Sequence, residues 1–99
     1  MKVNTKALQF DWDSGNSNKN KRNHAVEDWE CEEVFFDSKK VILKDKLHSD
    51  KEERFILLGK SKQERLLYIA FTIRREKVRV ISARDVTKRK EIELYEKAS

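Results

Sequence analysis

The stretch RLLYIAFTIRREKVRVISAR, Arg65–Arg84, carries the strongest secondary-structure signal in the chain. Arg65–Arg74 is the most apolar run, and Lys77–Arg84 alternates apolar and polar residues as a half-buried strand does. Only Arg75 and Glu76 separate the two runs, and so short a connection requires antiparallel pairing. The stretch therefore predicts a β-hairpin.

Further strands are expected before this hairpin. Lys40–Lys44 and Glu53–Lys60 are short apolar runs next to charged or polar loops, and short connections again favour antiparallel neighbours. Val3–Trp12 places apolar residues at alternate positions near its end, which predicts an additional first strand. The hairpin and the two runs before it should form an antiparallel meander of about four strands.

One helix is predicted over Glu27–Phe36, because acidic residues in its first turn complement the helix dipole. Within it, Cys31, Val34 and Phe35 fall at i, i+3 and i+4 and make a stripe for burial. Asp13–His24 contains no apolar residue, so a helix there should bury nothing. A polar helix and a mobile basic loop are both compatible with that tract.

At the end of the chain, Asp85 or Thr87 can cap a terminal helix. The predicted fold is α+β in one domain spanning residues 1–99, with helices on one face of the sheet and a C-terminal helix. The opposite face of the sheet is then free to bind a ligand.

Charge dominates the composition, with 41% charged and 37% apolar residues and a net charge of +5. Arg74–Lys90 holds eight lysines and arginines against two acids, whereas Ala25–Ser38 holds six acids and no base. A basic face of this kind suits a polyanion such as nucleic acid. A solubilising surface with internal ion pairs would have the same composition.

The rarer residues limit the chemistry. Cys31 is the only cysteine, which excludes an internal disulfide, and with no signal peptide expected it favours a reducing, cytoplasmic setting. No apolar run is long enough to cross a membrane. With only His24 and His48 beside Cys31, neither a metal site nor a cofactor is predicted.

Alternation along the strands assigns side chains to two sheet faces. In Arg65–Arg74 one set is purely apolar and should pack against helices, while the other is mixed and should be accessible. By the same alternation, Arg79 and Arg84 should lie on opposite faces. The apolar set is Leu67, Ile69, Phe71 and Ile73, and the mixed set includes Tyr68, Thr72 and Arg74.

Arginines cluster on these strands, and a guanidinium can bind a phosphate through two hydrogen bonds. Ion pairs with glutamates of the sheet are the simpler alternative for each arginine. His48, in a charged loop, is either a solvated residue or a proton-transfer group. Four arginines form the cluster: Arg54, Arg74, Arg79 and Arg84.

The junction between the last strand and the terminal helix is also basic. Arg84, Lys88 and Arg89 meet there, where a helix N-terminus would add its own attraction for an anion. We therefore expect a polyanion, or an acidic partner, to contact this junction.

Five further segments occur together in this order: FDWD (Phe10–Asp13), NKRNH (Asn20–His24), VFFD (Val34–Asp37), HSDKEERFILLG (His48–Gly59) and VRVISAR (Val78–Arg84). Together they resemble the BrnT-type toxins, the toxin halves of bacterial type II toxin–antitoxin pairs, and the resemblance runs from about Phe10 to Tyr95. It implies a RelE-like fold and an endoribonuclease that cuts RNA without metal by 2′-hydroxyl attack, inhibiting translation and growth. It also implies a cognate DNA-binding antitoxin of the ribbon-helix-helix type, through which alone operator DNA is bound, and no membrane partner.

The resemblance also suggests roles for residues. His48 or Glu53 would transfer protons, although Glu53 could equally orient Arg54. Asn16 and Asn23 stand where the family usually has lysines, and Ala25 where it has glycine, so a non-catalytic nucleic-acid-binding or antitoxin-docking module is the alternative function. Phosphate stabilisation would fall to Arg54, Arg74 and Arg84, with Arg79 as a further candidate, and flanking RNA would contact Lys19, Lys21, Arg22, Lys88 and Arg89.

Overall fold

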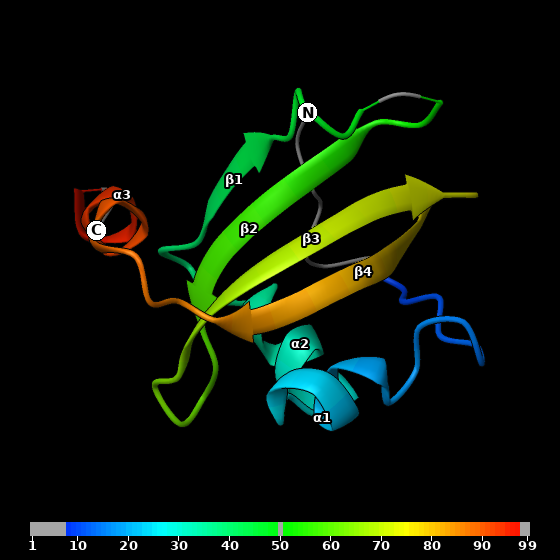
Figure 1. Ribbon diagram of the computed structural model, residues 1–99, viewed down its shortest axis with the longest axis horizontal. Coiled ribbons are helices and arrows are strands. Elements are labelled where there is room, and N and C mark those ends of the chain that lie inside the picture. Colours follow the sequence, from blue (N-terminus) through cyan, green and yellow to red (C-terminus); the bar gives the residue numbers. More distant parts are fainter. Residues whose placement is uncertain (1–7, 50, 98–99) are drawn as a thin grey trace.

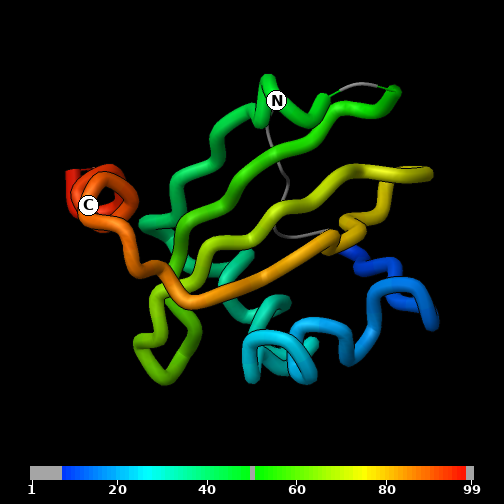
Figure 2. Tube along the Cα trace, in the orientation of Figure 1, coloured from blue at the N-terminus to red at the C-terminus, as the bar shows by residue number. Residues whose placement is uncertain are grey.

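Four antiparallel strands form one sheet in chain order, β1-β2-β3-β4 (Figures 1 and 2). The computed structural model describes residues 8–49 and 51–97. The α+β prediction is confirmed, as are the four strands of the meander. The elements are α1 (Lys19–His24), α2 (Asp28–Val34), β1 (Val41–Lys44), β2 (Arg54–Lys60), β3 (Leu66–Arg74), β4 (Lys77–Asp85) and α3 (Arg89–Lys97).

The first face of the sheet carries the main core. Its apolar side chains pack against α1 and α2, which lie together on that side (Figure 1). The buried stripe predicted for α2 is confirmed, since Cys31, Val34 and Phe35 are fully buried. Phe35 meets the Phe71 ring edge-on at 5.0 Å between centroids, a favoured aromatic geometry. The strand residues of this core are Phe55, Leu57, Leu67, Ile69, Phe71, Val78, Val80 and Ala83.

The second face of the sheet is partly covered by α3, which stands apart from α1 and α2 (Figure 1). Tyr95 of α3 is buried against Ile56 and Leu58 of β2, with Tyr68 and Ala70 at the margin. The free face expected from the sequence is therefore shortened at one end by the C-terminal helix.

A β-bulge in β4 changes which residues reach the second face. Phe71 pairs with Val80 and Ala70 pairs with Ser82, so Ile81 is an extra residue without a partner. Beyond it Arg84 pairs with Tyr68, while Arg79 before it pairs with Thr72, and paired residues share a face. The prediction that these two arginines lie on opposite faces is thus wrong, because one extra residue resets the alternation.

The N-terminal segment does not form the predicted strand. Residues 3–7 of the predicted strand Val3–Trp12 lie outside the described residues, and residues 8–12 make only an isolated bridge between Phe10 and Val78. The backbone N–H of Asp11 donates to the Val78 carbonyl at 2.8 Å, and the chain then turns away at Asp13. For residues 8–12 the strand prediction is wrong, because the pairing ends after one residue.

The polar tract Asp13–His24 contains α1. The expectation that a helix there would bury nothing is wrong, because two asparagines of the tract are buried. Asn16 and Asn20 are 3% and 1% exposed. The Asn16 amide donates to the carbonyls of Asp11 and Val80 at 2.9 and 3.1 Å, and the Asn20 side-chain oxygen accepts from the Ala83 N–H at 2.9 Å. Both asparagines are buried because they satisfy backbone groups of the edge strand β4.

Candidate functional site

A hollow of about 470 Å³ opens where the β1–β2 loop meets the end of β3; we call it the β2 hollow. The loop contributes His48, Lys51 and Glu52, the start of β2 contributes Arg54, and β3 contributes Arg74. Three of the candidates identified in the sequence, His48, Arg54 and Arg74, are therefore brought together here. Glu52 and Lys51 join them.

Arg74 is held in the β2 hollow by Glu52. Its Nε and Nη2 donate to the two oxygens of the Glu52 carboxylate at 3.0 and 2.8 Å. This hydrogen bonding lowers the pKa of Glu52 and raises the pKa of Arg74. Glu52 is thus an ionised residue that orients a guanidinium and is a weak proton acceptor.

His48 is oriented by a second carboxylate. Its Nδ1 lies 2.9 Å from Oδ2 of Asp45, and the ring remains largely exposed. When the neutral ring donates its Nδ1–H to Asp45, the lone pair of Nε2 is left for another proton. This arrangement is suited to proton transfer with a bound ligand.

Arg54 differs from the other clustered arginines in its partners. Its side chain is half-buried, and within residues 8–49 and 51–97 its guanidinium forms no ion pair or hydrogen bond, although the Glu52 carboxylate interacts with it electrostatically. A partly desolvated cation without a bound anion is a good ligand for a phosphate. The β2 hollow therefore combines an oriented imidazole, an oriented guanidinium and a guanidinium that no described residue holds by a hydrogen bond.

Glu53, chosen in the sequence for proton transfer, does not line the β2 hollow. It is exposed and pairs with Lys44 at 3.4 Å. Glu52 was missed, although strand alternation carries the signal: two residues before Arg54, it belongs to the same side of the chain.

The remaining arginines have partners elsewhere. Both Nη atoms of Arg79 donate to Asp13, at 3.0 and 2.9 Å, which ties the N-terminal segment to β4. Arg84 binds the Glu91 carboxylate of α3 at 3.0 and 3.3 Å and lies 4.0 Å over the Tyr68 ring. From the β-strand rise, Arg84 lies roughly 13 Å along the second face from the row that contains Arg54.

The predicted RNA-contacting residues divide between two places. Those of α1 lie on the side of the sheet opposite to the second face, and Lys21 there pairs with Glu27 at 3.3 Å (Figure 1). Those at the start of α3 are exposed. The α1 group is Lys19, Lys21 and Arg22, and the α3 group is Lys88 and Arg89.

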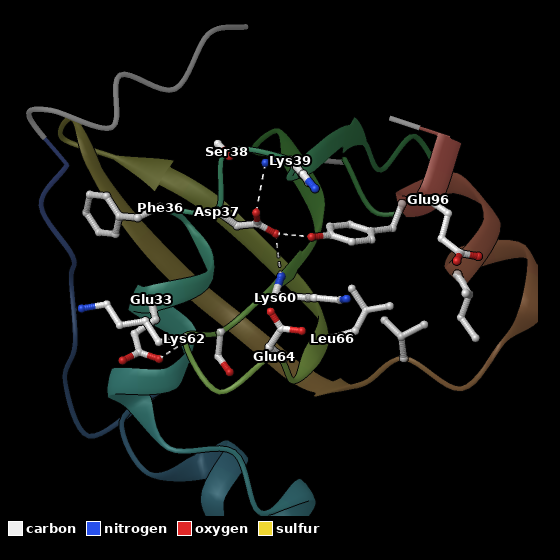
Figure 3. A pocket seen from close by; sticks show the side chains of 14 residues that line it. Glu33, Phe36, Asp37, Ser38, Lys39, Lys60, Lys62, Glu64, Leu66 and Glu96 are labelled. Carbon is white, nitrogen blue, oxygen red and sulfur yellow. Dashed lines mark hydrogen bonds between the residues drawn. The ribbon is translucent and has the colours of Figure 1, made fainter. Parts of the chain in front are cut away.

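A larger groove of about 900 Å³ runs between α3 and the α2–β1 connection (Figure 3). At its centre Asp37 accepts hydrogen bonds from the Tyr95 hydroxyl at 2.6 Å and from the backbone N–H groups of Lys60 and Lys39 at 2.8 and 3.0 Å. Burial acts to raise the pKa of Asp37, but these bonds outweigh it and the pKa is lowered. Asp37 thus anchors α3 to the sheet.

Neither a metal-binding cluster nor a membrane-crossing helix is found in the described part of the chain. Within it, no group of three His, Cys, Asp or Glu residues is placed to hold a metal ion. Its helices are too short and too polar to span a bilayer.

Comparison with known proteins gives one family. Residues 12–90 match the family model described as "Ribonuclease toxin, BrnT, of type II toxin-antitoxin system". The match covers the β2 hollow, the second face and the first residues of α3. None of the curated proteins matches the chain significantly.

Proposed function

The chain belongs to the BrnT family of ribonuclease toxins from type II toxin–antitoxin systems, and we propose that it cuts RNA at the β2 hollow without a metal ion. The observation that supports this site most directly is Arg54, a half-buried cation whose guanidinium no described residue holds by a hydrogen bond or ion pair, beside the Asp45-oriented His48. A phosphodiester is the anion that the family's activity would supply.

In the proposed reaction, the 2′-hydroxyl attacks the adjacent phosphorus while His48 Nε2 takes its proton. The phosphorus–5′-oxygen bond breaks, the 5′ oxygen gains a proton from solvent, and a 2′,3′-cyclic phosphate remains on the other fragment. Arg54 stabilises the charge that develops on the non-bridging oxygens. Arg74, whose Nε and Nη2 are held by Glu52, assists through its Nη1 and its positive charge. Positive charge from the two guanidinium groups takes the place of a metal.

The test is cleavage of a labelled RNA by the purified protein in excess chelator. We expect fragments ending in 2′,3′-cyclic phosphate and 5′-hydroxyl groups, at a rate that the chelator leaves unchanged. Binding without cleavage would instead support the non-catalytic alternative. Loss of cleavage on chelation, restored by a divalent ion, would reject the metal-free mechanism.

Membership of a type II family implies a cognate antitoxin. We propose that this partner is a ribbon-helix-helix DNA-binding protein that neutralises the toxin and carries it to operator DNA in the cytoplasm. Expression of the toxin alone should arrest bacterial growth, and co-expression with the antitoxin encoded beside it should restore growth. Harmless expression of the toxin alone would count against the assignment.

A further inference from the structure

Tyr68 and Arg84 form a stacked pair on the second face. They are directly opposite each other in the β3–β4 ladder, and the carbon at the centre of the Arg84 guanidinium lies 4.0 Å from the centroid of the Tyr68 ring. One flat side of the guanidinium is therefore covered by an aromatic ring.

The charge and the in-plane donors of Arg84 are largely satisfied within the protein. Glu91 accepts from both terminal nitrogens at 3.0 and 3.3 Å, and the Asp85 carbonyl accepts from Nη1 at 3.1 Å. A phosphate at this position would have to compete with a carboxylate that is already bound. Arg84 is thus poorly suited to phosphate, in contrast to Arg54.

The side chain of Arg84 remains partly accessible. The side chain is 30% exposed, whereas its Glu91 partner is 14% exposed and fixes the plane of the guanidinium. Because Glu91 holds its edge and Tyr68 covers one side, a ligand that stacks on this guanidinium would use the opposite side of the plane. Guanidinium planes and aromatic rings are the surfaces on which proteins stack unpaired nucleobases.

We propose that Tyr68 and Arg84 form a base-stacking subsite for single-stranded RNA, which rests on the proposed RNA-cleaving function. The subsite shares the second face with Arg54 but lies roughly 13 Å farther along the strands, so it binds a base other than that of the nucleotide being cut. Glu91 is a positioning residue that holds the guanidinium plane for this base.

The test uses an oligoribonucleotide with a 2′-deoxy substitution at the cut site, so that it binds without being cleaved. An abasic nucleotide is moved along it one position at a time. At one position we expect the wild-type protein to lose about tenfold in affinity. Tyr68→Leu should bind the intact oligonucleotide about tenfold more weakly and be insensitive to that abasic position.

Three further variants separate stacking from charge and from unfolding. Arg84→Lys keeps the charge but loses the flat guanidinium, so it should still bind more weakly. Tyr68→Phe keeps the aromatic ring and should bind as tightly as the wild type, unlike Tyr68→Leu. Lys77→Gln changes an exposed residue outside the subsite and should also bind as the wild type does. For cleavable RNA, Tyr68→Leu should raise KM and leave kcat nearly unchanged. Equal abasic effects in the wild type and Tyr68→Leu, or full affinity in Arg84→Lys, would overturn the subsite. Failure of the wild type to cut any RNA would reject the proposed function instead, and the binding arms would still test the subsite.

Discussion

Asn20 of α1 accepts a hydrogen bond through its side-chain oxygen from the backbone N–H of Ala83 in β4, at 2.9 Å. Asn16 makes the complementary contact with the Val80 carbonyl at 3.1 Å. Because β4 is the edge strand, these groups have no neighbouring strand to pair with. The two asparagines thus bracket Ile81, the bulged residue that brings Arg84 to the second face.

Replacing Asn20 should therefore destabilise the protein. Asn20→Ala leaves the buried Ala83 N–H without an acceptor, and we expect the free energy of unfolding to fall by about 1–3 kcal/mol. Urea denaturation measures this change. Asn23→Ala is the matched control, because Asn23 is exposed on the same helix and should change stability little. Equal effects of the two substitutions would show that the Asn20 contact has no net stabilising value.

Glycine at position 25 should stabilise the protein. Ala25 follows α1 with a φ of 55°, in the left-handed region that a side chain disfavours. We expect Ala25→Gly to raise the free energy of unfolding by about 1 kcal/mol, and Ala25→Val to lower it. Thermal and urea unfolding of both variants are the measurements. A more stable Ala25→Val would contradict the backbone argument.

Adding a side chain at Gly59 should destabilise the contact between α2 and β2. A Cβ there would lie 2.8 Å from Cγ1 of Val34 and 3.2 Å from the Val34 carbonyl oxygen. We expect Gly59→Ala to cost about 1–3 kcal/mol of unfolding free energy, as overpacking does. The double variant with Val34→Ala should recover only part of this loss, because the carbonyl remains. An unchanged unfolding midpoint for Gly59→Ala would refute the predicted close approach.

Tyr95→Phe should raise the pKa of Asp37, because the Tyr95 hydroxyl is one of the groups that lower it. A carboxyl whose pKa is lowered in the folded state adds stability above its unfolded pKa of about 4, and that stability is lost as the pH falls through the folded pKa. The wild type should therefore exceed Tyr95→Phe in stability more at pH 7 than at pH 3. Carbon-detected NMR titration of the Asp37 carboxyl and urea unfolding at both pH values measure the two effects. An identical Asp37 titration in both proteins would refute the coupling.

The strands and their apolar faces were predictable because they depend on local patterns. Leu67, Ile69 and Phe71 are fully buried on the first face, as alternation predicts. The bulge was not predictable in this way, since Ile81 is apolar like its neighbours and nothing in the pattern marks it as an extra residue. The burial of the two asparagines was not predictable for a different reason: their partners in β4, Val80 and Ala83, lie more than sixty residues away in the chain.

In the candidate site, too, some features follow from the sequence and others depend on tertiary contacts. His48, Arg54 and Arg74 were identified from residue type and from the family resemblance, and the fold brings them to one hollow. Glu52 could also have been identified from the sequence, because it lies two residues before Arg54 and alternation places both on the same side of the chain. Arg79 pairs with a carboxylate of the N-terminal segment, and Arg84 pairs with a carboxylate of α3. These partners are distant in the chain or depend on how α3 packs, so only the tertiary structure identifies them.

The central claim is that the guanidinium of Arg54, which no described residue holds by a hydrogen bond or ion pair, stabilises the transition state of RNA cleavage. Its most direct test is the single-turnover cleavage rate of Arg54→Gln at saturating protein, beside that of Arg75→Gln, which removes an exposed arginine from the β3–β4 turn. We predict a loss of about 100-fold or more for Arg54→Gln and the wild-type rate for Arg75→Gln. A wild-type rate for Arg54→Gln, or equal losses in both variants, would contradict the account.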